Sequence, residues 1–243
     1  MIRYKCVVMY DGTNFHGFQV QDELRTVQLE IENVLKIICK KEIRIYPAGR
    51  TDTGVHALGQ VFHFDTEIDM PNWNMKNAIN SRLPRDIHIL SVEHVDMDFH
   101  ARFSAHSKEY KYLIDIGEYN PLNGNYRYYY RHKLNLNKMI EASKIFVGEH
   151  DFKSFTKNHE LENTVRNIYS IDFDVKDTLI AITFKGNGFM HNMVRIIVAM
   201  MIEVSNDRLT IDRLKKIMEA KNRLLAPKIA PPNGLYLVSI NYK

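Results

Sequence analysis

The chain has 243 residues, of which 45% are apolar and 26% charged, and its formal net charge is +4. This is the composition of an ordinary soluble globular protein, long enough for one large domain or two modest ones with buried cores. No apolar run approaches the ~18 residues of a membrane helix, and no signal peptide is expected at the N-terminus. Only two cysteines occur, Cys6 and Cys39, which favours a reducing cytoplasm over a disulfide framework.

The first half of the sequence alternates expected strands and helices. Residues 2–10 are rich in β-branched and aromatic side chains and predict a strand. Thr26 can cap a helix, because apolar residues recur at helical spacing from Val27 to Ile38. Further elements are expected as strands over 43–46, 61–65 and 87–95 and as a helix over 72–83 that ends before Pro84.

The second half repeats this mixture of elements. The patterns predict a strand over 109–116, a helix over 137–147, a hairpin of 167–175 with 179–185, an apolar helix over 189–204, a basic helix over 211–220 and a strand over 235–241. We therefore expect an α+β fold of two similar halves, residues 1–103 and 104–243. Their antiparallel sheets would join into one extended sheet, with helices packed on it and a central cleft that holds the functional site.

Positive charge is concentrated toward the C-terminus. From residue 194 to 243 there are nine Lys or Arg and four Asp or Glu, so this stretch carries +5 and the rest of the chain is near neutral. Such a distribution suits a polyanion, RNA above all, although a solvated helix face has the same pattern.

A single carboxylate, Asp52, stands in a short loop between two expected strands, with Gly49 and Gly54 on either side. We expect these glycines to adopt positive φ and let the backbone approach a ligand. An ordinary solvated turn has the same residues. An aspartic protease is a second alternative, but it needs two carboxylates that share a proton, and the only Asp-Thr-Gly here would require a dimer partner. Arg50 also favours an ionised carboxylate.

The longer string AGRTDTGVHALGQV, residues 48–61, resembles the signature of the tRNA pseudouridine synthase A family. The resemblance continues over nearly the whole chain in the family's order. Its further stretches are YDGT at 10–13, TVQ at 26–28, LPRDI at 83–87, FHARF at 99–103, KEYKY at 108–112, GEHDF at 148–152, GFMHNMVR at 188–195, AP at 226–227 and GLYL at 234–237.

The resemblance implies that the protein isomerises uridine to pseudouridine at positions 38, 39 and 40 of the tRNA anticodon stem-loop, in the cytoplasm, as a homodimer and without a cofactor. It implies that Asp52 is the catalytic nucleophile, that Arg195 pairs with it and that Tyr110 stacks on the flipped uracil. Residues expected at the substrate or RNA surface are Arg50, His56, Arg102 and Leu235. The family's fold agrees with the two joined α+β halves.

The residues alone leave several roles open. Arg195 lies in a helix that is apolar on nearly every side, where it must reach water or an acid; a structural ion pair would also satisfy it. Tyr110 and Tyr112 share one strand face, and we take Tyr112 as a core residue. Leu235 can equally be a plain core leucine. The stretch YRYYYRH at 126–132 fits a single-stranded RNA platform and an exposed strand edge equally well.

Other chemistry finds no support in the motifs. None of the eleven histidines stands in a metal-ligand spacing, and no phosphate-binding or dinucleotide fingerprint occurs, so we expect neither a metal nor a nucleotide cofactor. The chain departs from the family's usual residues at Asn167, Ala199 and 205–207, which bears on tRNA docking. An RNA-binding module without catalysis is the remaining rival, against which Asp52, Tyr110 and Arg195 together argue.

Overall fold

The computed structural model describes residues 1–158 and 160–242 and divides the chain into two compact units. Unit 1 comprises Met1–His106 and Tyr236–Lys243, and unit 2 comprises Ser107–Leu235. The chain crosses between the units within two strands, β5 (Ala105–Asp115) and β10 (Leu235–Tyr242). The strand order is β4-β1-β3-β10-β5-β9-β8-β7, with β2 on β3 and β6 on β5, so all ten strands belong to one sheet.

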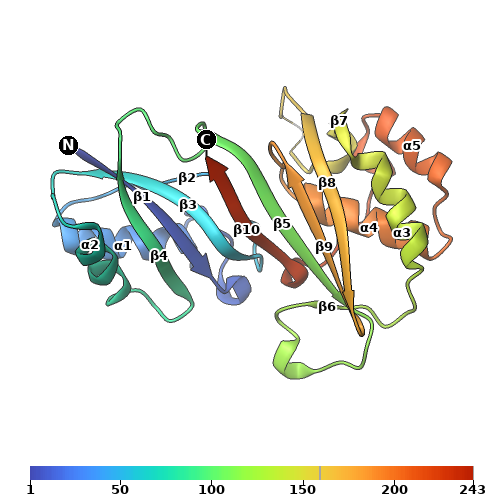
Figure 1. Ribbon diagram of the computed structural model, residues 1–243, viewed down its shortest axis with the longest axis horizontal. Coiled ribbons are helices and arrows are strands. Elements are labelled where there is room, and N and C mark those ends of the chain that lie inside the picture. Colours follow the sequence, from blue (N-terminus) through green and yellow to red (C-terminus); the bar gives the residue numbers. More distant parts are fainter. Residues whose placement is uncertain (159, 243) are drawn as a thin grey trace. The chain divides into compact units, whose positions relative to one another are not determined.

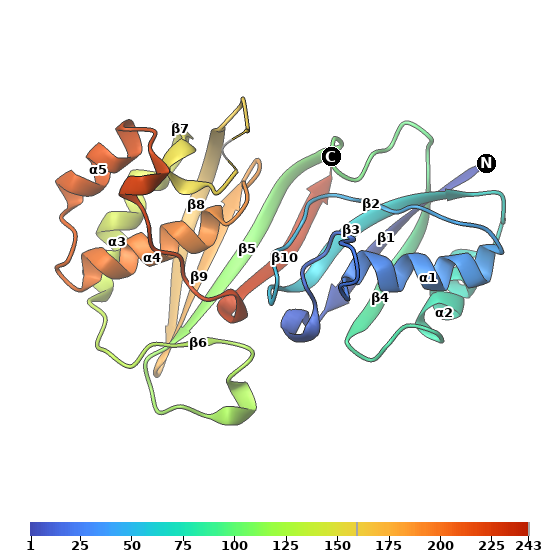
Figure 2. The ribbon, with the colours of Figure 1, turned by 180° about the vertical axis from the view of Figure 1, so that it is seen from behind.

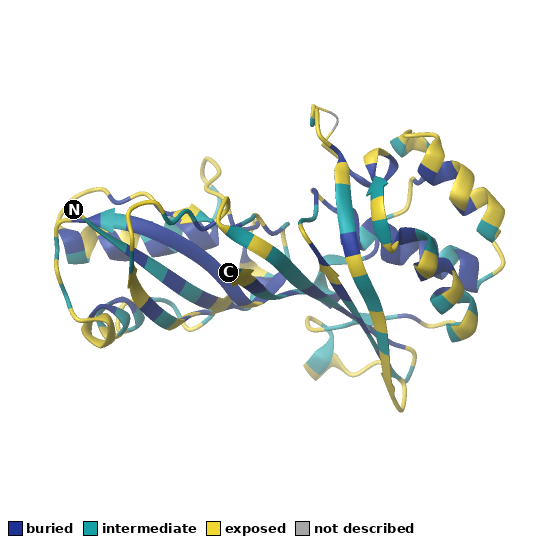
Figure 3. Ribbon diagram, turned by 45° about the horizontal axis from the view of Figure 1, so that its top comes forward, coloured by how far each residue is buried: buried dark blue, intermediate teal, exposed yellow. Residues whose placement is uncertain are grey.

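Unit 1 is built on the central strand β1 (Ile2–Tyr10), which runs antiparallel to β3 (His56–Thr66) and to β4 (Ile87–Val95). Buried residues recur at every second position of β1 from Tyr4 onward, because alternate side chains point to opposite faces of a sheet. The colours of Figure 3 alternate along strands of this kind, whereas β3 is buried at nearly every position. The short strand β2 (Tyr46–Pro47) pairs antiparallel with β3, whereas β10 runs parallel to it.

Two helices belong to unit 1, α1 (Val27–Cys39) and α2 (Asn72–Asn80). The Thr26 hydroxyl accepts the N–H of Leu29 at 3.4 Å and caps α1, as the sequence predicts. In Figure 2 α1 lies in front of the unit's strands and in Figure 1 behind them, so it covers one face of the sheet. Helix α2 contacts both α1 and β4.

Unit 2 contains the antiparallel strands β5, β9 (Leu179–Gly186), β8 (Val165–Lys176) and β7 (Gly148–Asp151). Strands β8 and β9 form the predicted hairpin. Its turn places Asp177 at φ +54°, a conformation that Asp tolerates better than most residues. The two-residue strand β6 (Tyr128–Tyr129) runs parallel to the end of β5.

Three helices complete unit 2: α3 (Leu136–Ser143), α4 (Met193–Ser205) and α5 (Ile211–Glu219). Helix α4 is buried at nearly every position and lies against one face of β8 and β9 (Figures 1 and 2). Helix α5 buries Leu214, Ile217 and Met218 and exposes its charged face. Short 3₁₀ turns cover Gly12–Asn14, Pro121–Asn123, Lys144–Phe146, Lys153–Phe155, Arg223–Leu225 and Pro232–Gly234.

The α+β class with one extended sheet is confirmed, with two parallel pairings, β3–β10 and β5–β6, that the antiparallel prediction lacked. The strand expected over 43–46 is wrong except at Tyr46. Side chains of α1 replace a partner strand there: Glu32 accepts the N–H of Ile45 at 3.0 Å, and Gln28 donates to its carbonyl at 3.4 Å.

Several ends also differ from the prediction. The helix expected over 189–204 begins only at Met193, because Asn192 before it is left-handed at φ +62°. The helix expected over 72–83 ends at Asn80, whose amide instead bonds both backbone groups of Ile89. Strand β7 and the short strand β6 had no clear signal in the sequence. Within the described part of the chain, no helix is both long enough and apolar enough to span a membrane.

Candidate active site

Asp52 is half-buried in the loop between β2 and β3. The backbone of this loop is bonded to the segment that follows β1: the N–H of Phe18 donates to the carbonyl of Thr51 at 3.2 Å, and the N–H of Gly54 to that of Phe15 at 3.3 Å. Within the loop, the N–H of Val55 donates to the Asp52 carbonyl at 3.1 Å. These bonds fix the backbone from which the carboxylate projects.

Two glycines make this geometry possible. Gly54 has φ +76°, which favours glycine over residues with a Cβ. A Cβ on Gly12 would lie 2.0 Å from the carbonyl oxygen of Val55, so only glycine lets the two segments meet. The prediction for Gly49 was wrong: among the described glycines, positive φ is found at Gly17, Gly54 and Gly148 and not there. Gly49 instead accepts a hydrogen bond from the Gln60 amide at 2.8 Å.

His56 supports the same loop from within the core. It is 2% exposed, its Nδ1 accepts the N–H of Gly12 at 3.0 Å, and its ring stacks on Tyr236 at 4.8 Å. The same Nδ1 also lies 3.2 Å from a carboxylate oxygen of Asp11. Thr51 is held in a similar way, 2.8 Å from the buried hydroxyl of Tyr10.

The two arginines expected at the RNA surface in unit 1 are both exposed. Arg50 lies in the Asp52 loop itself. Arg102 lies in a separate turn before β5, with its guanidinium 5.7 Å from the centre of the Phe103 ring.

In unit 2, Arg195 lies in the first turn of α4 and is half-buried. Its Nε donates to the carbonyl of Ala230 at 2.7 Å, and the N–H of Ala230 donates back to the carbonyl of Arg195 at 3.1 Å. The adjacent carbonyl of Pro231 accepts the hydroxyl of Tyr112 at 2.8 Å. The segment before β10 is therefore attached to both α4 and β5.

Tyr110 and Tyr112 lie on β5, opposite Phe184 and Ile182 of β9. Tyr110 is 8% exposed and meets the ring of Phe189 edge-on at 5.1 Å. Tyr112 is fully buried, as predicted for a core residue, and burial raises the pKa of its hydroxyl well above the usual range, although the positive charge of Arg195 opposes this.

Leu235 is buried at the start of β10, directly after Gly234. A Cβ on Gly234 would lie 2.7 Å from the carbonyl oxygen of Leu113 and 2.9 Å from the Tyr112 ring. Close approach of β5 to this glycine thus sets the position of Leu235.

The aromatic stretch 126–132 packs against the end of β5 and is partly exposed. Its Arg127 pairs with the buried Asp115 at 3.0 Å. Burial alone would raise the pKa of Asp115, but hydrogen bonds from Gly117, Arg127 and Thr178 outweigh it and lower the pKa. The ion pair of Arg127 with Asp115 therefore links the residue before β6 to the last residue of β5.

Arg50 and Asp52 thus share one loop of unit 1, with His56 at the start of the strand that follows it, while Tyr110, Arg195 and Leu235 belong to unit 2. Sequence reasoning missed the backbone carbonyls of Ala230 and Pro231, and it gave Gly12 no role. The run of prolines at 227, 231 and 232 was the available signal for a rigid segment. Among the described residues, no group of three or more His, Cys, Asp or Glu could hold a metal ion.

Comparison with known proteins identifies the chain's relatives. The family model described as tRNA pseudouridine synthase matches residues 6–104 and 142–243. Proteins named tRNA pseudouridine synthase A are similar over the full chain. The protein from Limosilactobacillus reuteri is 44% identical and covers 100% of this chain and 97% of its own length. The protein from Listeria monocytogenes serotype 4b is 44% identical and covers 100% of both chains. The protein from a Geobacillus strain is 46% identical and covers 99% of this chain and 98% of its own length.

The chain therefore belongs to the tRNA pseudouridine synthase family, a family of isomerases, and the membership predicted from the motifs is confirmed. Among solved structures, a Cbf5-Nop10-Gar1 complex shows 12% identity and a TM-score of 0.37 over 82% of this chain and 54% of that chain. This likeness is too low to support an argument.

Proposed function

We propose that this protein converts uridine to pseudouridine in tRNA, at positions 38, 39 and 40 of the anticodon stem-loop. The observation that carries the proposal is full-length similarity to proteins named tRNA pseudouridine synthase A, combined with a loop that presents the single carboxylate Asp52 from a fixed backbone. The base must leave its stack before it can react, because the glycosidic bond is inaccessible within a stem.

Asp52 is the catalytic carboxylate of this proposal. It either attacks the sugar or the base as a nucleophile or accepts a proton that starts an elimination. The bond between C1′ and N1 breaks, the uracil turns, and a bond forms between C1′ and C5. The proton on C5 is released, and N1 gains one. Water must be excluded meanwhile, since hydrolysis of the detached base would leave an abasic site.

Arg195 is proposed as the ion-pair partner of Asp52, and the anchoring of its Nε on Ala230 supports this role because it fixes the plane of the guanidinium. Tyr110 is proposed to stack on the target uracil, and Leu235 to line the same pocket. Arg50 is proposed to hold the RNA beside the extruded base. His56 and Arg102 complete the proposed RNA-binding set, His56 through its support of the loop.

The proposal includes a cytoplasmic homodimer, as the family resemblance implies, and a domain boundary between residues 103 and 104. Light scattering of the purified protein at several concentrations measures the oligomeric state. A molecular mass equal to that of one chain at all concentrations would contradict the dimer.

The function is tested by mapping pseudouridine in a transcribed tRNA after incubation with the protein. Carbodiimide adducts of pseudouridine stop reverse transcription, so stops at positions 38, 39 or 40 that depend on the protein are expected. Stops elsewhere in the tRNA would contradict the proposed positions. Tight binding of tRNA without any stop would instead support an RNA-binding module without catalysis.

A further inference from the structure

A turn of unit 1, residues 99–104, carries one strongly exposed ring, that of Phe103, which the proposed reaction does not use and behind which less exposed rings are packed. Phe103 is 77% exposed, and its ring centre lies 4.4 Å from that of His100. His100 in turn lies 4.7 Å from the buried His63, against which Tyr46 stacks at 5.2 Å. An aromatic side chain so far exposed gains little from its own fold, which makes it a candidate for a ligand contact.

The turn is fixed by hydrogen bonds on both of its sides. His100 and Ser104 bond each other twice, through the N–H of His100 to Ser104 Oγ at 3.0 Å and the N–H of Ser104 to the His100 carbonyl at 2.9 Å. The N–H of Ala101 donates to His63 Nδ1 at 3.1 Å, and the Ala101 carbonyl accepts the Tyr242 hydroxyl at 2.7 Å. A ligand would therefore meet a ring whose backbone is already ordered, which lowers the entropic cost of binding.

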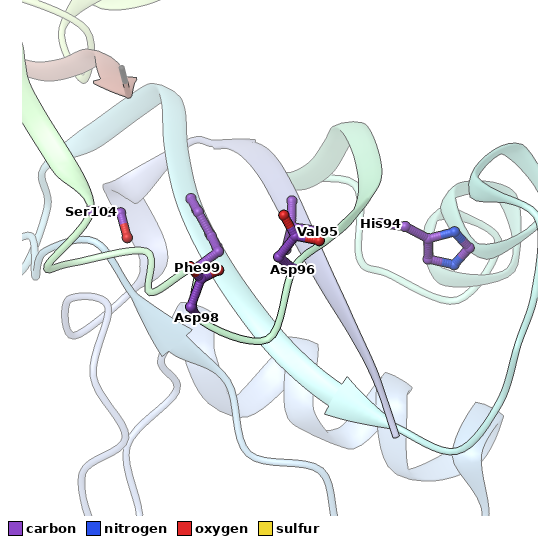
Figure 4. A pocket seen from close by; sticks show the side chains of 6 residues that line it. All are labelled: His94, Val95, Asp96, Asp98, Phe99 and Ser104. Carbon is purple, nitrogen blue, oxygen red and sulfur yellow. The ribbon is translucent and has the colours of Figure 1, made fainter.

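The charges around the ring favour an anionic chain that approaches from the side of Arg102. The Arg102 guanidinium lies 5.7 Å from the Phe103 ring and is exposed. Beyond the turn lies a hollow of 530 Å³, lined by residues of this turn and by the carboxylates of Asp96 and Asp98 (Figure 4). Those carboxylates repel phosphate, so a polyanion is directed toward Arg102.

This surface is well separated from Asp52 within unit 1. His56 adjoins the Asp52 loop, and His63 lies seven residues further along β3. At ~3.3 Å per residue these positions are roughly 23 Å apart. A base on Phe103 would therefore be a different nucleotide from the uridine that reacts.

We propose that Phe103 and Arg102 form a second nucleotide subsite, in which an unpaired base of the tRNA stacks on the Phe103 ring and its phosphate pairs with Arg102. The subsite rests on the proposed action on tRNA and contributes to binding, while the chemistry occurs at Asp52. Stacking on an aromatic ring accepts any base, since every base has a π-face. Proteins that bind single-stranded nucleic acids combine stacking rings with arginine in this way.

The test measures the affinity of transcribed tRNA for the wild type and for Phe103→Ala, Phe103→Leu and Phe103→Trp, together with single-turnover rates at saturating protein. Loss of the ring in the Ala and Leu variants is expected to weaken tRNA binding on the order of ten-fold. The Trp variant should retain the wild-type affinity, and the loss should appear in KM rather than in kcat. Trp73→Ala is the matched control, because Trp73 is 67% exposed in the same unit and has Lys76 5.8 Å from its ring.

Equal affinities for the wild type and the Ala variant would overturn the subsite. So would a Leu variant as tight as the wild type, because it would indicate an apolar contact of the kind a protein partner makes. A wild-type protein that neither binds nor isomerises tRNA would overturn the proposed function and this subsite together. Normal binding and isomerisation with unaffected Phe103 variants would overturn the subsite alone.

Discussion

Arg195 and Ala230 hold each other through two reciprocal hydrogen bonds, one from the Arg195 Nε to the Ala230 carbonyl at 2.7 Å and one from the Ala230 N–H to the Arg195 carbonyl at 3.1 Å. Because the side chain and the backbone of one residue are both attached to the same partner, the guanidinium of Arg195 cannot turn without moving the segment that leads into β10. The hydroxyl of Tyr112 holds that segment at its next residue, Pro231.

Arg195→Lys should therefore lower kcat by at least ~10-fold although it retains the positive charge. Lysine has no Nε–H to donate to Ala230 and no planar fork to direct at a carboxylate. Steady-state kinetics with transcribed tRNA measures the effect. Arg208→Lys is the control, since Arg208 forms a half-exposed pair with Glu203 at 3.6 Å that contributes little. An Arg195→Lys variant with wild-type kcat would show that the anchored geometry is not needed.

The stability of the protein should fall in mild acid because of His63. Burial lowers the pKa of this histidine to about 4, and the positive charge of Arg3 and the ring of His100 act in the same direction. The unfolded chain, with a histidine pKa of about 6.5, binds the proton at higher pH than the folded chain does. The contribution of the neutral His63 to the free energy of unfolding is therefore fully present above pH 6.5. As the pH falls from 6.5 toward 4, the free energy of unfolding decreases by roughly 3 kcal/mol.

Urea unfolding at pH 7.5 and pH 4.5 measures this dependence. His63→Phe should be less stable than the wild type at pH 7.5, because the hydrogen bond with Ala101 is lost, yet it should lose less stability on acidification. The exposed His88, changed to Phe, serves as control and should behave as the wild type does. Identical losses in the wild type and His63→Phe would contradict the assignment to His63.

Binding of tRNA should depend on the exposed lysines of α5. Lys215 and Lys216 point into solvent, whereas Lys221 is engaged with Asp151 at 2.9 Å, so the first two are the cations able to meet phosphate. The double change Lys215→Glu with Lys216→Glu should weaken tRNA binding several-fold. It should also reduce the slope of log affinity against log salt concentration by the equivalent of about two phosphate contacts. The rate at saturation should remain that of the wild type.

A matched change of two exposed lysines in unit 1, Lys40→Glu with Lys41→Glu, controls for the loss of net positive charge. An equal loss of affinity in both double variants would mean that total charge matters and the α5 face does not. A lower reaction rate at saturation in the α5 variant than in the wild type would place the reacting part of the RNA near that helix.

The sequence was sufficient wherever a local pattern decides the structure. Strand β1 has the predicted bounds, Thr26 caps α1, and the β8–β9 hairpin turns at the predicted residues, because period and capping act over a few neighbours. The expected strand over 43–46 failed for a tertiary reason. Glu32 and Gln28, distant in sequence, satisfy the backbone of Ile45 in place of a neighbouring strand.

The candidate site was predicted only in part for the same reason. A motif identified Asp52, Tyr110 and Arg195, but no pattern signals that a backbone carbonyl, that of Ala230, receives Arg195 Nε. Nor does spacing signal that Gly12 is needed because a Cβ would meet Val55 at 2.0 Å. The resemblance to the family identified residues of the site but not the contacts that make them necessary. Lys243, counted among the C-terminal cations, lies outside the described residues.

The central claim is that Asp52 performs the isomerisation, and tritium release from tRNA that contains 5-tritiated uridine tests it most directly. Bond formation at C5 expels the proton there, so each conversion releases one tritium. The wild type and Asp22→Asn, a change at an exposed acid, should release tritium at equal rates. Asp52→Asn should release none while it binds tRNA within a few-fold of the wild type, because the loop backbone and the cations remain. Release by Asp52→Asn at a rate comparable to the wild type would contradict the account.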